Sequence, residues 1–382
     1  MIPISSSEKK MQMFRAVTRK EWEETARNEW EGVKPSEITA LPTHGTAIEP
    51  YYDRSDLPSH SNSQLYASEE EFLGARIWLN MPLISCKSDL EANQKACEWL
   101  ASGADGILFE LSDSSNPETL LKGIELPFCN ISFLSDERQE FFFQRFLMYI
   151  KTKKYAPESV SGTIFWKTPP ANLPDLISQF IPSAQFHAGG IIEGKERKSA
   201  ADDIAALLAK AVKQIDIVSP LHALAKGKGN GEHIIDIKDA VHSIAFSASV
   251  STDLFLEIAK LKALRMLWHQ VACSYTPEYT AKPFIHAFSK IWTKSEYEPH
   301  SNMLKGTTSA MSAILGGCDS LTTQAEDQTS EWMTRIARNI SSILREEAHF
   351  STVADPTAGS YYLEKLIDRL AQDAWKKFQD LV

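Results

Sequence analysis

Seven polar side chains lie in or beside the apolar runs that predict strands, and their types are those that could do chemistry. They are Glu110, Asp113, Gln185, His187, Lys282, His286 and Asp319. Histidines and carboxylates can serve as general acids and bases when a fold holds them next to a substrate. Each one alone is more often a satisfied polar group of the core than a catalyst. Their meaning therefore depends on the elements that position them.

Those elements alternate between short apolar runs and helical stretches. Eight runs are candidate strands, at residues 75–83, 106–111, 128–134, 162–166, 184–192, 242–249, 283–289 and 318–322. The stretches between them have helical periodicity, most clearly at 89–101, 137–150 and 200–215. This alternation is typical of βα units around a parallel sheet. Eight units predict an α/β fold, a (β/α)₈ TIM barrel, in which functional residues gather at the carboxyl ends of the strands.

The longest predicted helix follows the sixth strand, at residues 254–271. Ser251 and Asp253 have side chains that can cap its first turn. Its apolar residues recur at spacings of three and four, and charged residues fall off that stripe, namely Glu257, Lys260 and Arg265. The pattern predicts a helix with one apolar face and one polar face. Further helices are expected at 330–347 and from Tyr361 to the end of the sequence.

The sequence before the first strand differs in composition from the rest. Residues 1–74 are rich in Glu, Ser, Pro and charged residues, with one helical piece at 18–30 and an extended segment at 43–52. Trp22 and Trp30 share a face of that helical piece. We expect residues 1–74 to form an arm that contacts another subunit, and residues 75–382 to form the barrel domain.

Composition excludes several classes of protein. The 382 residues carry a net charge of −10, which argues against nucleic-acid binding. No run of eighteen apolar residues and no signal-peptide core occurs, so neither a membrane span nor secretion is expected. The five cysteines include no C-x-x-C pair, which predicts no metal site and no disulfide scaffold. A cytoplasmic location follows.

Three long phrases resemble a known family. They are LEIAKLKALRMLW from Leu256, RIARNISSILREE from Arg335 and DPTAGSYYLEKL from Asp355. The chain is similar through them to the barrel domain of the methylmalonyl-CoA mutases. The resemblance implies a barrel from a family that rearranges acyl-CoA carbon skeletons with adenosylcobalamin. Such enzymes often pair a catalytic large (alpha) chain with a smaller companion chain.

The strands that would carry the chemistry depart from the family's pattern. His187 can be matched to a histidine that contacts the thioester carbonyl, but its setting has changed. In the seventh strand, Phe284 and Phe288 occupy the positions at which the catalytic chains of the family have Arg and Gln. In the eighth, Asp319 and Thr322 replace Gln and His, and a carboxylate there would repel an anionic substrate. These changes remove groups that would grip a carboxylate and a thioester.

The resemblance therefore implies the small (beta) subunit, without catalysis of its own. The pattern Asp-x-His-x-x-Gly, which holds cobalamin in the family, does not occur, so we expect no cobalamin-binding domain in this chain and adenosylcobalamin in the large subunit. No catalytic, cofactor-binding or metal-binding residue is expected. A vestigial pocket could retain Glu110, Gln185, His187, His286 and Asp319. The implied partner is the large (alpha) subunit, with a homodimer possible in isolation.

Two other interpretations stay open at the level of sequence. The chain could be an active acyl-CoA mutase with a cobalamin domain supplied in trans, or an unrelated barrel enzyme that uses His187 and Glu110. It could also be a barrel scaffold with no partner. The seventh strand discriminates among them, because Phe284 and Phe288 alternate along it and point to the same face. If that face is the interior, the two rings fill volume that a pantetheine chain would need.

Overall fold

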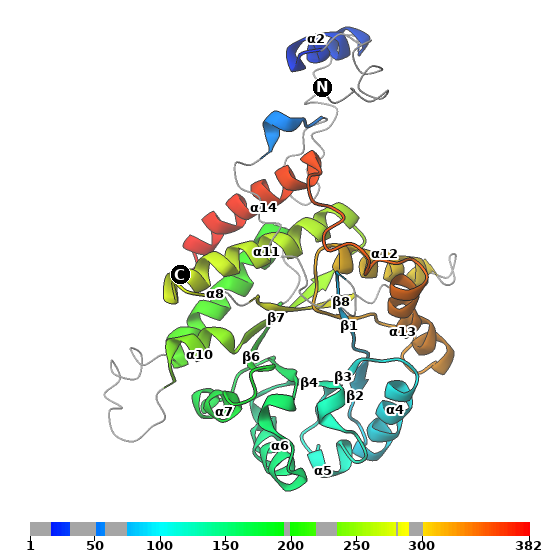
Figure 1. Cartoon of the computed structure of the whole chain (residues 1–382), viewed down its shortest axis with the longest axis vertical. Helices are drawn as coiled ribbons and strands as arrows, with labels where there is room; N and C mark the ends of the chain where they lie inside the picture. Colours follow the sequence, from blue (N-terminus) through cyan, green and yellow to red (C-terminus); the bar gives the residue numbers. More distant parts are fainter. Residues whose placement is uncertain are drawn as a thin grey trace, which may run out of the picture. The chain divides into compact units, whose positions relative to one another are not determined.

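The computed structural model describes residues 17–30, 51–57, 75–194, 199–218, 235–279, 282–289 and 301–382 (Figure 1). The chain divides into two compact units, Met1–Asp56 and Leu57–Val382. The predicted boundary between arm and barrel, at residue 74, lies at the edge of residues 58–74, which are outside the described ranges.

The N-terminal unit is built around helix α2, Arg19–Glu29, which confirms the helix expected at 18–30. The spacing Thr-x-x-Glu forms a capping box, in which Thr18 accepts from the backbone of Glu21 and the Glu21 carboxylate accepts from the backbone of Thr18. The 3₁₀ helix η1, Arg54–Asp56, is tied to α2 because Arg19 binds the Asp56 carboxylate at 3.0 Å. Trp22 stacks on Tyr51 with 5.1 Å between ring centroids. Most of the extended segment expected at 43–52 lies outside the described residues.

The second unit holds one curled, all-parallel sheet in the order β1-β9-β8-β7-β6-β5-β4-β3-β2. Its strands are β1 Leu79–Asn80, β2 Leu83–Ser85, β3 Gly106–Glu110, β4 Asn130–Ser135, β5 Gly162–Trp166, β6 Phe186–Ile192, β7 Ile244–Val250, β8 Phe284–Ser289 and β9 Ser320–Thr322. Each of the eight predicted runs overlaps one of these strands, and the first contains β1 and the start of β2. The sheet and its helices are consistent with a TIM-like barrel.

The first predicted run is interrupted at Pro82. Strands β1 and β2 are neighbours in the chain but stand at opposite ends of the strand order. The Met81 N–H donates to the carbonyl of Leu321 in β9, whereas the Pro82 carbonyl accepts from Leu108 in β3. Pro82 has no N–H of its own, which explains why the regular ladder stops there. This short segment therefore hydrogen-bonds to both ends of the sheet.

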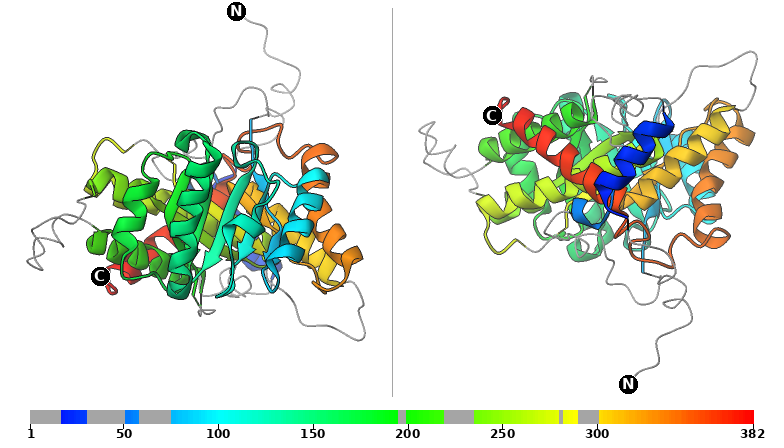
Figure 2. Two further views of the ribbon diagram at one scale, coloured as in Figure 1. Left: turned by 90° about the horizontal axis from the view of Figure 1, so that it is seen from below. Right: turned by 90° about the horizontal axis from the view of Figure 1, so that it is seen from above.

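Helices surround the outer face of the sheet (Figures 1 and 2). They are α4 Asp89–Ala101, α5 Pro117–Leu120, α6 Glu140–Lys153, α7 Leu173–Phe180, α8 Ala200–Val218, α10 Ile237–His242, α11 Leu254–Tyr275, α12 Ser301–Leu315, α13 Glu331–Glu346 and α14 Tyr361–Gln379, with short 3₁₀ turns η3 Leu126–Phe128, η4 Glu137–Gln139 and η5 Pro157–Ser159. The helix expected at 89–101 has the predicted bounds, and those expected at 330–347 and after Tyr361 are confirmed.

The interior of the curled sheet is filled by side chains. Leu108, Phe165 and Ala245 form a buried cluster there, and Phe284 and Phe288 pack against it. The outward-facing residues of the same strands, such as Phe109 and Phe133, instead join the core under the helices. The prediction that Phe284 and Phe288 share one face is therefore correct, and that face is the interior.

The amphipathic interpretation of helix α11 is wrong. Asp253 caps it as expected, since its carboxylate accepts from the N–H of Leu256 at 3.3 Å. Charged residues predicted to be solvated are buried, with exposed fractions of 5% for Glu257, 4% for Lys260 and 2% for Arg265. The reason is that α8, α12 and α14 pack on α11 from outside while the sheet lies beneath it (Figure 1).

Each buried charge on α11 has a partner. Lys260 binds Glu257 at 2.6 Å and the carbonyl of Ser249 at 2.6 Å. Lys262, also fully buried, binds both carboxylate oxygens of Asp355, at 2.7 and 2.8 Å. Arg76 lies 3.8 Å from the same carboxylate. These pairs let a charged helix occupy the core, because a buried ion is tolerated only when it is paired.

Asp355 begins the phrase DPTAGSYYLEKL, and the structure explains that phrase as a connection into α14. The Asp355 carboxylate accepts from the N–H of Thr357 at 3.1 Å. Gly359 has φ +79°, a left-handed conformation that favours glycine. Ser360 then caps α14 by accepting from Leu363. The phrase thus places α14 on α11.

We predict that Asp355→Asn destabilises the protein by about 3–5 kcal/mol at neutral pH, because Lys262 and Arg76 would be left buried without a carboxylate. Denaturant unfolding measures the change. The matched control is Asp368→Asn in α14, whose ion pair with Lys365 is half-exposed and 3.5 Å long. That variant should lose less than about 1 kcal/mol. Equal losses in the two variants would contradict this role for Asp355.

The difference in unfolding free energy between the wild type and Asp355→Asn should also depend on pH. Burial acts to raise the pKa of Asp355, but the hydrogen bonds and charge of Lys262, together with Thr357, outweigh it and hold the pKa below its usual value. A carboxyl with a lowered pKa in the folded state contributes stability above its unfolded pKa of about 3.9, and loses it as the pH falls through the folded value. The stability gap between wild type and Asp355→Asn should therefore shrink on acidification below about pH 4. A constant gap would contradict the assignment.

Candidate functional site

The structure divides most of the candidate residues between the two ends of the sheet. Glu110 ends β3, and Asp113 follows in the loop at the carboxyl end of the sheet. His286 lies in the middle of β8. The remaining candidates lie at the amino ends of their strands, namely Gln185, His187, Lys282 and Asp319. In the strand register, His187 of β6 is paired with Thr163 of β5. Glu110 is instead aligned, through β4 and β5, with Gly190 of β6, three residues further along that strand. That offset is about 10 Å along the strands, so the pair His187 and Glu110 does not form one site.

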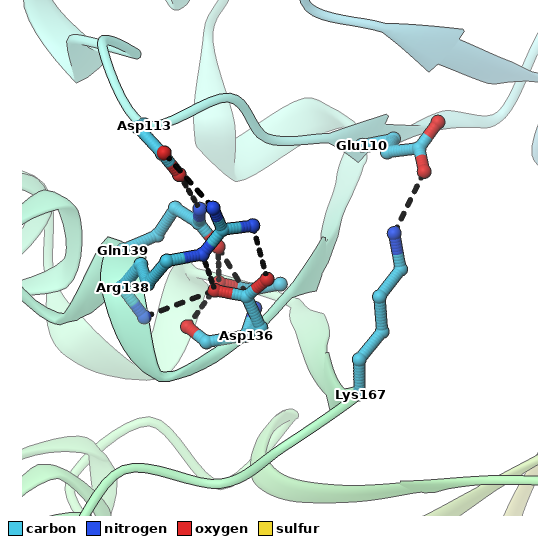
Figure 3. A network of polar contacts seen from close by, with 7 residues as sticks. Glu110, Asp113, Asp136, Arg138, Gln139 and Lys167 are labelled. Carbon is cyan, nitrogen blue, oxygen red and sulfur yellow. Dashed lines mark hydrogen bonds and ion pairs between the residues drawn. The ribbon is translucent and has the colours of Figure 1, made fainter.

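At the carboxyl end, Glu110 is a fixed carboxylate. It accepts from Lys167 at 2.8 Å, as Figure 3 shows, and from Ser85 at 2.7 Å. Burial acts to raise the pKa of Glu110, but these two hydrogen bonds and the charge of Lys167 outweigh it, so the pKa lies below its usual value. A carboxyl held in its ionised form cannot serve as a general acid near neutral pH.

Asp113 belongs to a separate group of polar contacts beside Glu110 (Figure 3). Its carboxylate accepts from Arg138 at 3.1 Å and from Gln139 at 2.6 Å. Asp136 caps η4 and binds Arg138 at 2.9 Å. The side chains of Asp113 and Arg138 are largely exposed. This group stabilises the start of α6. Within it, the guanidinium of Arg138 pairs with the carboxylates of Asp113 and Asp136.

His286 is enclosed at the centre of the sheet. Its Nδ1 lies 2.8 Å from the hydroxyl of Ser320, and its Nε2 lies 3.3 Å from the hydroxyl of Thr322. Thr322 donates its own proton to the carbonyl of Met81. The Thr322 oxygen therefore accepts a hydrogen bond from the Nε2–H of His286, and the Ser320 hydroxyl donates to Nδ1. This pattern corresponds to the neutral imidazole that carries its proton on Nε2. Burial lowers the pKa of His286 to about 3, so the imidazole does not exchange protons near neutral pH.

At the amino end, His187 and Gln185 border an open hollow of about 920 Å³ that also includes Asp105 and Asn130. The ring of His187 stacks on Phe284 at 5.4 Å, and its Nδ1 donates to the carbonyl of His242 at 3.0 Å. Burial lowers the pKa of His187, with the His242 carbonyl opposing that effect. His187 therefore lies at the face opposite to the one on which barrels place their reactive groups.

Asp319 has a structural role that the sequence did not suggest. Its carboxylate binds Arg265 at 2.7 Å and accepts from the N–H of Ile285 at 2.7 Å. Arg265 also donates to the carbonyls of Pro283 and Gly317. The charge of Asp319 is paired with that of Arg265, and the expected repulsion of an anionic substrate stays a prediction.

The described histidines of the sheet do not fit a lower ligand of cobalamin. His286 is enclosed by Ser320 and Thr322, and His187 lies at the amino end against Phe284. Neither presents an imidazole at the carboxyl end of the strands. Among the described residues, no group of three histidine, cysteine or acidic side chains is arranged to hold a metal ion. No described helix is long and apolar enough to cross a membrane.

Comparisons with known proteins show which family this chain is similar to. Residues 227–382 match the model of the family described as methylmalonyl-CoA mutase. The methylmalonyl-CoA mutase small subunit of Porphyromonas gingivalis is 29% identical to this chain, over 97% of this chain and 64% of the relative. The resemblance to the methylmalonyl-CoA mutase family is confirmed.

Shorter matches within this family agree. The probable methylmalonyl-CoA mutase small subunit of Mycobacterium bovis is 32% identical over 47% of this chain and 29% of its own length. The methylmalonyl-CoA mutase of Cereibacter sphaeroides is 34% identical over 42% of this chain and 22% of its own length. The chain thus spans less than two thirds of the length of each of these methylmalonyl-CoA mutase relatives.

The sequence did not reveal which residues bind the candidate carboxylates Glu110 and Asp319. Lys167 directly follows β5 and Ser85 ends β2, so both lie at the carboxyl end beside Glu110. Their places at strand ends were a usable signal, since carboxyl ends of parallel strands meet at one face. The pairing of Arg265 with Asp319 had no such signal, because 54 residues separate them in the chain.

We predict that His286 does not titrate between pH 5 and pH 8, because burial lowers its pKa to about 3. An accessible histidine has a pKa of about 6.5. Proton–nitrogen NMR of a histidine-labelled sample measures each ring, and the spectrum of His286→Gln assigns the His286 signals. A midpoint near pH 6.5 for those signals would show that the interior admits a proton and water.

Proposed function

We propose that this chain is the small, non-catalytic subunit of an adenosylcobalamin-dependent methylmalonyl-CoA mutase. The large subunit would carry out the isomerisation of methylmalonyl-CoA and succinyl-CoA. The relatives in Porphyromonas gingivalis and Mycobacterium bovis, which are named as small subunits, support this proposal. The family is one of isomerases, and the specific role of this chain rests on the interior of its sheet.

The single observation that carries the proposal is the filled interior. Phe284 and Phe288 pack against the cluster that includes Leu108 and Phe165. His286 lies between those two phenylalanines in β8 and is 0% exposed. An acyl-CoA that entered along the barrel would have to displace the buried His286 and the two partly buried phenylalanine rings beside it. The arrangement favours a scaffold over a substrate channel.

The charges at the two ends of the sheet support the same proposal. Glu110 is bound by Lys167, and Asp319 is bound by Arg265. A catalytic carboxylate needs a reacting atom within reach and a pKa suited to proton transfer. Both carboxylates instead hold neighbouring elements of the chain itself.

Three finer features belong to the proposal. We take the fold to be a (β/α)₈ barrel in which β1 and β2 act as one strand, since they bond to opposite ends of the sheet. Adenosylcobalamin supplies the radical chemistry when it is bound, and we assign it to the large subunit. All five cysteines are free thiols, which supports a cytoplasmic location.

The test is co-expression with a tagged large subunit from the same genome. We expect this chain to co-purify with the large subunit. The mutase activity of the large subunit should be absent or lower when this chain is left out. The isolated chain, incubated with adenosylcobalamin and desalted, should show no corrin absorbance. A stoichiometric corrin band, or mutase activity of the chain alone, would contradict the proposal.

The arm is the surface that we propose contacts the large subunit. Aromatic side chains often dominate binding energy at interfaces, and this short unit carries Trp22, Tyr51 and Trp30. Trp22 and Tyr51 already stack on each other, so together they form a preorganised aromatic pair. Preorganisation lowers the entropic cost of binding.

We predict that Trp22→Ala combined with Trp30→Ala weakens association with the large subunit by about 2 kcal/mol or more, the usual threshold for hot spots. The melting temperature of the barrel should not change. Trp332→Ala is the control, because Trp332 is 65% exposed on α13, and it should leave the dissociation constant unaltered. Lower barrel stability with unchanged affinity would assign the two tryptophans to the fold of this chain.

A further inference from the structure

Helices α4 and α13 lie side by side on the outer face of the sheet (Figures 1 and 2). Their side chains border a cleft. We call it the α4–α13 cleft. It has a volume of about 270 Å³. Its walls come from α4, from α13, from β2 and from the loop after β9, and they include Ser85, Lys95, Trp99, Thr323, Gln324 and Arg338.

Arg338 is the unusual residue of this cleft. Its side chain is in α13 and is only 8% exposed, yet its Nε and Nη1 have no hydrogen-bond partner. In the part of the chain that the structure describes, no carboxylate forms an ion pair with Arg338. Buried polar groups are almost always hydrogen-bonded, and a buried guanidinium without an acceptor is costly. An acceptor from outside the chain would satisfy it.

Three further groups surround the guanidinium. Arg338 lies over the ring of Trp99 at 5.3 Å, and Lys95 lies over the same ring at 4.6 Å. Burial lowers the pKa of Lys95, and the nearby positive charge of Arg338 lowers it further. The hydroxyl of Thr323 is also buried without a partner. Two cations and an unused hydroxyl therefore share one enclosure.

The acidic residues near the cleft compensate only part of this charge. Glu91 lines it, and Glu98 and Glu331 lie close enough to act electrostatically on Lys95. All three glutamates are exposed to solvent, which screens their interaction. Lys87 lines the cleft as well and adds a third positive charge.

We propose that the α4–α13 cleft binds a small organic oxyanion, a phosphate or a carboxylate, with Arg338 as its main ligand. A guanidinium presents a planar fork of donors that matches both anions. Lys95 and Thr323 supply further donors, and Trp99 forms an apolar wall. The volume is below the about 300 Å³ at which sites for drug-sized ligands begin. The occupant is therefore smaller than a nucleotide or a coenzyme.

This site is independent of the proposed subunit role. The cleft lies outside the sheet, whereas Phe284, Phe288 and His286 lie inside it. A metabolite bound there would contact both β2, at one end of the strand order, and the loop after β9, the strand next to the other end. It would thereby link two regions that lie far apart in the strand order.

The experiment uses the isolated full chain and calorimetric titration at low ionic strength, with inorganic phosphate and glutarate as separate probes. We expect one-to-one binding of at least one probe, and the stronger of the two identifies the chemical class. Arg338→Met should weaken that binding by at least about tenfold. It should not lower the melting temperature, because it removes a buried charge that has no partner.

Arg335→Met is the matched control, since Arg335 is an exposed residue of α13 three positions earlier and does not line the cleft. It should change affinity by less than about twofold. Thr323→Val is a second variant with little change of shape, and it should weaken binding by about threefold or more. The proposal is overturned if neither probe binds the wild type, if Arg338→Met binds as tightly as the wild type, or if Arg335→Met loses as much affinity.

Discussion

The fold depends on how the charges of α11 are paired inside the protein. This helix is covered by α8, α12 and α14 on one side and by the sheet on the other. Lys262 reaches Asp355 at the start of the α14 connection, and Arg265 reaches Asp319 beside β9. Since an unpaired buried ion is costly, each pair fixes a distant segment against α11. The outer helices and the β8–β9 edge are positioned by these contacts.

This constraint explains which parts of the sequence resemble the methylmalonyl-CoA mutases most. The phrases at 256–268 and 355–366 contain Lys262, Arg265 and Asp355. Lys262 pairs with Asp355 in the connection that leads into α14, and Arg265 pairs with Asp319 beside β9. The departures fall inside the sheet, where Phe284 and Phe288 replace donors and fill the interior. The residues that pair the outer helices with α11 are therefore different from the residues that line the interior of the sheet.

The sequence predicted the parts of the fold that depend on local rules. The bounds of α4 follow from the Ser88 cap and from regular periodicity, and Asp253 caps α11 as its position suggests. Periodicity could not show that Glu257 and Lys260 are buried, because it describes one helix and not what covers it. The break at Pro82 could have been predicted, since proline cannot donate to a ladder.

The candidate site was harder to predict than the fold. A run of apolar residues does not show where a strand starts, so the sequence could not show that His187 lies one residue after the start of β6, at the amino end of the sheet. Asp319 and Glu110 were identified as polar residues at strands, but the cations that neutralise them come from other elements. Such pairings depend on register and on helix packing, which become visible only in three dimensions.

The central claim is that the interior of the barrel has no room for an acyl-CoA. Fluorine NMR of the isolated chain labelled with fluorophenylalanine tests it directly, with the signals of Phe284 and Phe288 assigned from their leucine variants. During titration with methylmalonyl-CoA, we expect neither signal to move, because both rings stay packed in the interior cluster. Movement of both signals that saturates at one equivalent of ligand would contradict the account.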